Sequence, residues 1–127
     1  MRETKEEMGG SYDYDNDLSI LGTAQSVPAI TGIPVTPVIG ALTEDINNVA
    51  DVFEPNDDEV DFVFSRTIKS LLKSETFEPL IRTEHAPAYP GKEGKIWGLT
   101  AIILSPLLHE ILAPAFLEYC DNPNTAR

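Results

Sequence analysis

The spacing of hydrophobic and polar residues changes from one segment of this chain to the next. The first strongly apolar stretch runs from Val27 to Leu42. Its valines and isoleucines are interrupted by Pro28, Pro34 and Pro37. Proline lacks a backbone N–H and fixes φ, so this spacing excludes a helix and disfavours a central strand. We therefore expect an extended apolar ribbon, which needs another surface to cover it.

Two short amphipathic helices are predicted after this ribbon, over residues 43–53 and 60–73. Thr43 is a suitable N-cap followed by two acidic residues, and apolar residues then recur at helical spacing up to Pro55. The second helix places its acids before its bases, which suits the helix dipole, although its first residues also fit a strand. Residues 75–91 are rich in proline and predict a meandering connector. The whole region 27–91 is therefore expected to be a Pro-rich ribbon with two short helices.

Residues 1–26 predict an acidic extended arm. The segment has many acids and few aliphatic side chains, so it cannot offset its own ordering entropy, and we expect it to order against a partner. Alternating aspartates from Asp13 to Asp17 match the first half of a calcium-binding loop. Leu18 stands where such a loop needs glycine, and Ala24 where it needs a bidentate glutamate. A solvated acidic arm is the favoured interpretation.

Residues 92–127 predict an apolar helical segment and a polar tail. From 97 to 117 the only ionisable residues are His109 and Glu110, and an aromatic residue stands near each edge, with Trp97 at the first. About 20 apolar residues match the thickness of a bilayer, and tryptophan is typical of the membrane interface. This pattern predicts a helix that spans or is embedded in a membrane, with the N-terminal region on the positively flanked side.

The prolines of the same segment leave a second possibility open. Pro106 and Pro114 interrupt the helical hydrogen-bond ladder, which would kink a spanning helix. Ser105 and Ala113 stand immediately before these prolines and can instead start new helices, giving three short buried helices in a soluble protein. The expected fold class is mainly α with long irregular Pro-rich extended segments, and with one Pro-kinked transmembrane or membrane-embedded helix near the C-terminus as the first alternative.

Charge and length narrow the class of protein. A chain of 127 residues normally forms one domain. Its 9 basic and 21 acidic residues give a formal net charge of −12, which repels phosphate backbones, so nucleic acid is not an expected partner. The charged N-terminus predicts no secretory signal peptide. Cys120 is the only cysteine, which excludes an intramolecular disulfide and a multi-cysteine metal site.

The candidate site residues are His109, Glu110 and Trp97, as contacts for a partner subunit or a pigment. Ionisable residues inside an apolar segment are functional candidates, His109 as a ligand of a pigment metal and Glu110 as a hydrogen-bond acceptor. Ala113 replaces the second histidine of a zinc-protease motif, nothing in the sequence activates Cys120, and nucleotide-binding motifs are missing. We predict no enzyme, no catalytic residue and no metal ligand set, and the sequence does not define a cofactor.

These observations predict a non-catalytic small accessory or structural subunit of a larger membrane-associated multi-protein assembly, such as a photosynthetic or respiratory complex. Its partners would be other protein subunits, with membrane lipid or pigment beside the C-terminal segment. The arm and ribbon would staple neighbouring subunits together. The alternative is a soluble acidic binding or adaptor protein, or a virion structural protein, located in the cytoplasm or an organellar interior. A soluble module predicts a compact monomer with Trp97 buried.

Overall fold

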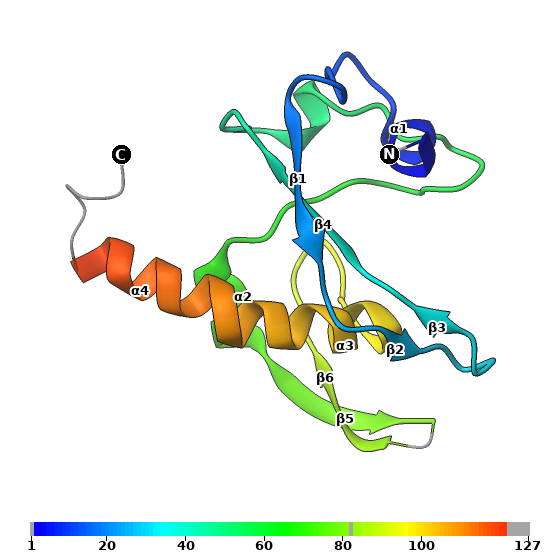
Figure 1. The fold of residues 1–127 in the computed structure, drawn as a ribbon, viewed down its shortest axis with the longest axis vertical. Helices are drawn as coiled ribbons and strands as arrows, with labels where there is room; N and C mark the ends of the chain where they lie inside the picture. Colours follow the sequence, from blue (N-terminus) through cyan, green and yellow to red (C-terminus); the bar gives the residue numbers. More distant parts are fainter. Residues whose placement is uncertain (1, 82, 122–127) are drawn as a thin grey trace. The chain divides into compact units, whose positions relative to one another are not determined.

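The computed structural model describes residues 2–81 and 83–121, and it shows that the predicted mainly α fold class is wrong. The chain is mixed, with 34% of it helical and 24% in antiparallel strands. Strands form in the proline-rich ribbon because Pro28 and Pro34 lie at strand ends, where their missing N–H groups interrupt little of the pairing. The elements in chain order are α1 (Arg2–Met8), β1 (Leu18–Thr23), β2 (Val27–Pro28), β3 (Pro34–Val35), β4 (Val38–Leu42), the 3-10 helix η1 (Val49–Asp51), α2 (Ile68–Ser74), β5 (Thr76–Leu80), β6 (Thr83–Ala88), α3 (Gly98–Leu107), the π-helix η2 (Leu108–Leu112) and α4 (Ala113–Asp121) (Figure 1).

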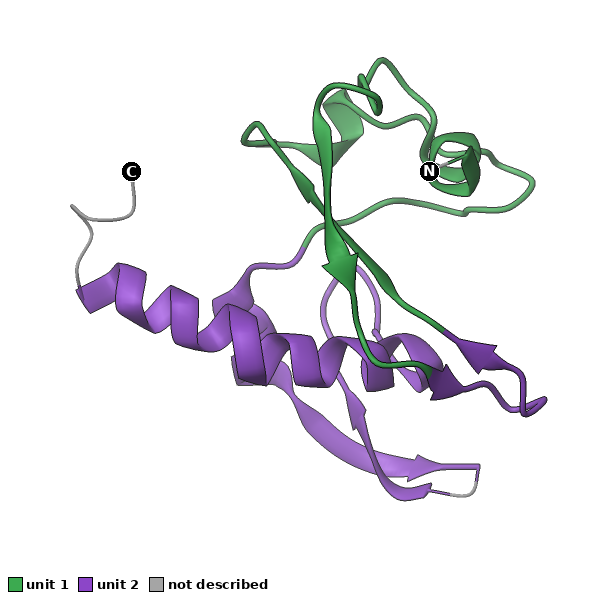
Figure 2. Cartoon of the chain, viewed as in Figure 1, with its two compact units in different colours: residues 1–26, 36–65 green, residues 27–35, 66–127 purple. Residues whose placement is uncertain are grey.

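The chain divides into two compact units (Figure 2). Unit 1 consists of residues 1–26 and 36–65, and it contains α1, η1 and the antiparallel pair of β1 with β4. Unit 2 consists of residues 27–35 and 66–127, and it contains the remaining strands and helices. The chain passes from one unit to the other within the proline-rich ribbon, so the ribbon contributes to both.

The sheet of unit 1 is a two-stranded ribbon with a bulge. Leu18 pairs with Leu42 at one end and Thr23 with Val38 at the other, and the register shifts between Ile20 and Gly22. Gly22 has φ of 150°, a conformation that other residues rarely adopt. A bulge adds local twist to a ribbon, and most of the apolar side chains of this pair are exposed.

Aromatic packing orders the N-terminal segment that the sequence predicted as an extended arm. Tyr14 and Phe53 are 4% and 7% exposed, and the ring centroid of Tyr12 lies 5.2 Å from that of Tyr14 and 5.5 Å from that of Phe53. Gly9 and Gly10 allow the close approach, since a Cβ on Gly10 would lie 2.1 Å from a carbonyl oxygen of the opposite backbone. The tyrosines thus supply the burial that the segment's missing aliphatic residues do not.

The helix predicted over residues 43–53 is only the 3-10 turn η1 in the structure. Thr43 does not act as an N-cap, because its backbone N–H and its hydroxyl both donate to the carbonyl oxygen of Asp17, at 2.9 and 3.1 Å. These bonds extend the β1–β4 pairing by one residue. The side chain of Asn48 instead accepts from the N–H of Ala50 and starts η1.

The core of unit 2 lies between α2, β6 and α3. Its fully buried members are Tyr89, Ala101 and Leu108, all at 0% exposure, with Leu71 at 6%. The helix predicted over 60–73 is shortened to α2, which starts where the Thr67 side chain accepts from the N–H of Ser70. The small core therefore consists of Tyr89, one leucine from α2 and one from η2, and Ala101, whose small side chain lets α3 pack closely.

The segment predicted as a connector over residues 75–91 forms the hairpin of β5 and β6. Thr76 pairs with Ala88 and Leu80 with Thr83, with a register shift before the turn. Ala86 and Ala88 are 2% and 0% exposed, so alternate residues of β6 face the helices. Small alanines on this face let α3 pack closely against the strand.

The C-terminal helices α3, η2 and α4 form one continuous helical run rather than three short helices (Figure 1). The N–H of Ala113 bonds to the carbonyl of Leu108 across the wide π turn. This turn places an extra residue directly before Pro114, where the regular ladder is interrupted in any case because proline has no N–H. The run Gly98–Asp121 has 24 residues, and within the described part of the chain it is the one helix long and apolar enough to cross a membrane.

Candidate functional site

The structure separates the predicted contact residues into two places on the helical run. Trp97 is the N-cap residue of α3 and is 59% exposed. His109 and Glu110 lie in η2, about 18 Å further along the helix axis at 1.5 Å per residue. The three residues therefore do not form one site.

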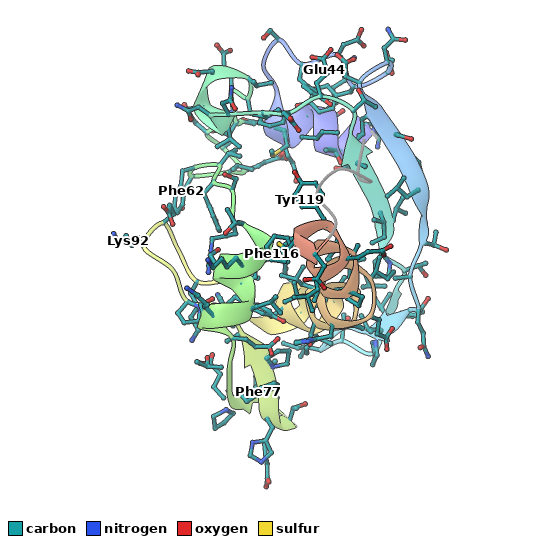
Figure 3. The ribbon with its side chains drawn as sticks, turned by 90° about the vertical axis from the view of Figure 1, so that its left-hand side faces the viewer. Glu44, Phe62, Phe77, Lys92, Phe116 and Tyr119 are labelled. Atoms are coloured by element: carbon teal, nitrogen blue, oxygen red, sulfur yellow. The ribbon has the colours of Figure 1, made fainter. Side chains whose placement is uncertain are left out.

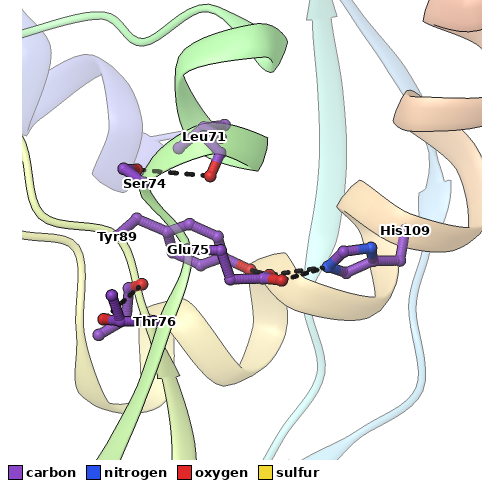
Figure 4. A network of polar contacts seen from close by, with 7 residues as sticks. Leu71, Ser74, Glu75, Thr76, Tyr89 and His109 are labelled. Carbon is purple, nitrogen blue, oxygen red and sulfur yellow. Dashed lines mark hydrogen bonds and ion pairs between the residues drawn. The ribbon is translucent and has the colours of Figure 1, made fainter.

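His109 is held by a carboxylate that the sequence did not indicate. Its Nε2 atom lies 2.7 Å from Oε2 and 2.9 Å from Oε1 of Glu75, the residue that ends α2 (Figure 4). The Glu75 side chain is 12% exposed and that of His109 is 47% exposed. In this structure Nε2 is therefore engaged, and it is not the atom that would bind a pigment metal. Glu110, the next residue, is exposed.

Tyr89 completes this cluster from the other side. Its hydroxyl donates to Oε2 of Glu75 at 2.6 Å, so one carboxylate contacts both the tyrosine and the histidine. Burial raises the pKa of Tyr89 to about 12, with further contributions from the hydrogen bond to Glu75 and from its charge. Tyr89 therefore remains a proton donor at neutral pH. We call Glu75, Tyr89 and His109 the Glu75 cluster, and it links α2, the end of β6 and η2.

Arg66 supports this cluster from before α2. Its guanidinium group donates to the Tyr89 carbonyl at 3.2 Å, to Ser70 Oγ at 3.1 Å and to Ser74 Oγ at 2.8 Å. These bonds join the first and last turns of α2 to the backbone that carries Tyr89. The arrangement holds helices against a strand, and the Glu75 carboxylate, the Tyr89 hydroxyl and the Arg66 guanidinium each have a partner within the protein.

A large apolar pocket lies elsewhere in unit 2, and we call it the apolar pocket. Its volume is about 750 Å³, within the range of ligand sites in proteins. Three segments line it: β2 with the residues that follow it (27–30 and Gly32), the end of β5 with Ile81 and the start of β6 (Leu80, Ile81 and Thr83), and residues 97–100 with Ile102 at the start of α3. Trp97, predicted as a contact residue, thus lies at this pocket.

The acidic segment in unit 1 uses its aspartates locally. Asp13 accepts from the side chain of Asn16 at 2.7 Å and from its backbone N–H at 3.2 Å, which holds the pKa of Asp13 below its usual value. Among residues 2–81 and 83–121, no group of three or more histidine, cysteine or acidic side chains is placed to hold a metal ion. Cys120 is exposed near the end of α4.

The sequence alone did not indicate Glu75, Tyr89 or the lining of the apolar pocket. Both polar residues lie in the segment interpreted as a connector, where prolines obscured the strands. Only Ala86 and Ala88 alternate with a larger residue in β6, which is too short a pattern to predict a strand. No local pattern connects Glu75 with His109, because the two residues are 34 positions apart.

Comparisons with protein-family models, with curated proteins and with solved structures give no match to this chain. The class of protein is therefore defined by its own features. The described residues form a small mixed α/β protein with an acidic surface, a long apolar helix and an apolar pocket.

Proposed function

We propose that this protein is a non-catalytic accessory subunit of a membrane-associated multi-protein assembly. The observation that carries the proposal is the helical run Gly98–Asp121, which is apolar enough for a membrane and yet is only 17% buried over its most apolar window. An apolar helix left open in this way favours a partner surface that covers it.

The two faces of the helical run have different surroundings. The inner face contacts unit 2 through Ala101 and Leu108, both fully buried. Three large apolar side chains in the second half of the run, Ile111, Leu117 and Tyr119, are 60%, 59% and 52% exposed, and we call this exposed set the outer face. Figure 3 shows Tyr119 and Phe116 on the last turns of the helix. Fully burying a side chain of this size contributes roughly 1.5–3 kcal/mol, so covering these half-exposed side chains favours contact with a partner.

The contacts of the helical run favour docking on partner subunits and disfavour a helix that crosses the bilayer alone. The β5–β6 hairpin packs against the run, and a two-stranded hairpin has open edges whose backbone groups cannot be satisfied in hydrocarbon. Crossing the bilayer alone would require unit 2 to open. A protein partner embedded in the membrane covers the outer face without that cost, and the exposed Glu110 is available to accept a hydrogen bond from it.

The polar groups support a non-catalytic role. In the Glu75 cluster, the carboxylate, the imidazole Nε2 and the phenol bind one another. None of the three residues lines the apolar pocket, so the cluster does not face the one large cavity described in unit 2. The cluster is best explained as the device that fixes η2 against α2.

A second candidate function, a soluble adaptor, is favoured by the tertiary contacts of α3 and η2. Tyr89 and Leu108 are completely buried in a core that needs no membrane. An adaptor would use the same outer face to bind a soluble partner. A compact soluble module would bury Trp97, whereas Trp97 is exposed in the structure. This residue therefore argues against the second candidate.

The test is alkaline carbonate extraction from the native cells, followed by gel filtration in mild detergent. We expect the wild-type chain to stay with membranes and to elute far above its own 14.0 kDa. The double variant Ile111→Ser with Leu117→Ser should be released from membranes, whereas the matched control Phe62→Ser, which alters a side chain of unit 1 that is 55% exposed, should not. Release of the wild-type chain into buffer as a monomer would contradict the proposal.

A further inference from the structure

We propose that the apolar pocket of unit 2 binds one acyl chain of a lipid whose headgroup is uncharged or zwitterionic. The volume of about 750 Å³ suits a ligand of that class. Three segments far apart in the sequence enclose the pocket, so it is a product of the tertiary fold and not of a single loop.

The lining selects an apolar ligand. Among the described lining residues only the side chains of Thr83, Thr100 and Trp97 have a polar atom, and none is ionisable. A buried charge without a partner is strongly unfavourable, so a charged group of the ligand must stay outside the pocket. A long hydrocarbon chain meets this requirement, because its headgroup is at one end.

The surroundings of the pocket allow the chain to enter from an apolar phase. Ile30, Ile81 and Trp97 line the pocket and are 73%, 68% and 59% exposed, so apolar surface continues from the lining to the outside. Tryptophan also suits a boundary between hydrocarbon and water, because its ring is apolar and its indole N–H is polar. These residues form a path from a lipid layer into the pocket.

The charge of unit 2 decides the headgroup. Unit 2 has 7 basic and 7 acidic residues, so the excess of acids lies in unit 1, and the lining offers no basic side chain among its described residues to pair with an anionic headgroup. An uncharged or zwitterionic headgroup needs no such partner. The proposal relies on the proposed function only for the source of the lipid, since Gly98 both lines the pocket and begins the run that is apolar enough for a membrane.

The experiment uses Trp97, the only tryptophan, as an internal reporter. The purified full-length chain is titrated with lysophosphatidylcholine that carries a spin label on its acyl chain, below the concentration at which it forms micelles. We expect saturable quenching of Trp97 fluorescence that the unlabelled lipid reverses. Glycerophosphocholine, which has the headgroup without the chain, should neither quench nor compete.

Two variants connect the quenching with the pocket. Thr100→Phe, in the first turn of α3, and Ala29→Leu, on a different lining segment, should each weaken binding by about tenfold or more, because they occupy the space of the chain. The matched control Thr23→Phe makes the same change as the first variant on an exposed strand of unit 1 and should bind as the wild type does. Far-UV circular dichroism of each variant verifies the fold.

Each other outcome overturns the proposal. Absence of quenching, quenching that both filled variants retain, or equal competition by the headgroup alone would show that no acyl chain occupies the pocket. A blue shift of Trp97 that grows with protein concentration without lipid would show that a second copy occupies it. The lipid is supplied as monomers, so this experiment does not depend on membranes. A negative binding result would therefore overturn only the lipid proposal, and release of the chain during carbonate extraction would overturn only the proposed function.

Discussion

Removing the hydroxyl of Tyr89 tests the role assigned to the Glu75 cluster. Tyr89→Phe deletes the donor that lies 2.6 Å from Oε2 of Glu75 and preserves the ring that fills the core. A hydrogen bond to a charged acceptor contributes about 1.5–3 kcal/mol, so the variant should lose that much free energy of unfolding at pH 8. Loss of the bond also leaves His109 as the remaining side-chain partner of a carboxylate that is only 12% exposed.

The same variant makes a prediction about pH, whose sign follows from the raised pKa of Tyr89. The folded protein holds the phenol proton up to a pKa of about 12, whereas the unfolded chain releases it near 10. This stabilisation is present in full below pH 10 and is lost as the pH rises toward 12. At pH 11 the wild type should have lost about 1.4 kcal/mol of it, and Tyr89→Phe, which has no proton there to lose, should show no corresponding loss.

The assay is urea unfolding of both proteins at pH 8 and pH 11, followed by far-UV circular dichroism and by Trp97 fluorescence, which reports on unit 2. Other tyrosines and lysines titrate in both proteins, so the difference between the two isolates Tyr89. The difference in free energy of unfolding should shrink by about 1.4 kcal/mol between the two pH values. A difference that stays constant to pH 11 would refute the assignment of the raised pKa to this buried contact.

Three further predictions concern stability of the purified chain, each measured by urea unfolding. Leu108→Ala should lower the free energy of unfolding by about 2–5 kcal/mol because Leu108 is fully buried. Leu117→Ala on the exposed outer face should change it by less than about 0.5 kcal/mol. Similar losses at both positions would contradict the assignment of the two faces. Gly10→Ala should lower the free energy of unfolding clearly more than Gly32→Ala. Both glycines have φ near +80°, but only at Gly10 would the new Cβ lie 2.1 Å from a backbone oxygen. Equal losses would refute the close backbone approach in unit 1. Thr67→Ala should cost about 1 kcal/mol through the lost N-cap of α2, and an unchanged midpoint would show that the cap contributes nothing.

Local pattern predicted those parts of the fold that depend on local physics. The apolar run after Trp97 is a helix, because its residues favour one and because the π turn accommodates Pro114. The helix predicted over residues 60–73 is present only from Ile68 to Ser74, because the Thr67 side chain caps it seven residues after the predicted start. Each of these elements is determined mainly by neighbours in the sequence.

Tertiary contacts determined the parts that pattern did not predict. Thr43 has the features of an N-cap, yet its hydroxyl donates to Asp17 across the sheet, and the predicted helix is lost. The prolines of the ribbon predicted irregular structure, although they lie at the ends of short paired strands. His109 was recognised as a candidate from its place in the apolar run, but its partner Glu75 is 34 residues away and only the fold brings them together.

The most direct test of the central claim is the accessibility of the outer helix face in the native assembly. Leu117→Cys and the exposed control Asp58→Cys, each in a Cys120→Ser background, are reacted with a maleimide in purified chain and in native membranes. We expect both cysteines to react readily in the purified chain. In native membranes Leu117→Cys should be strongly protected while Asp58→Cys still reacts. Equal reaction of Leu117→Cys in native membranes and in the purified chain would contradict the claim that a partner covers this face.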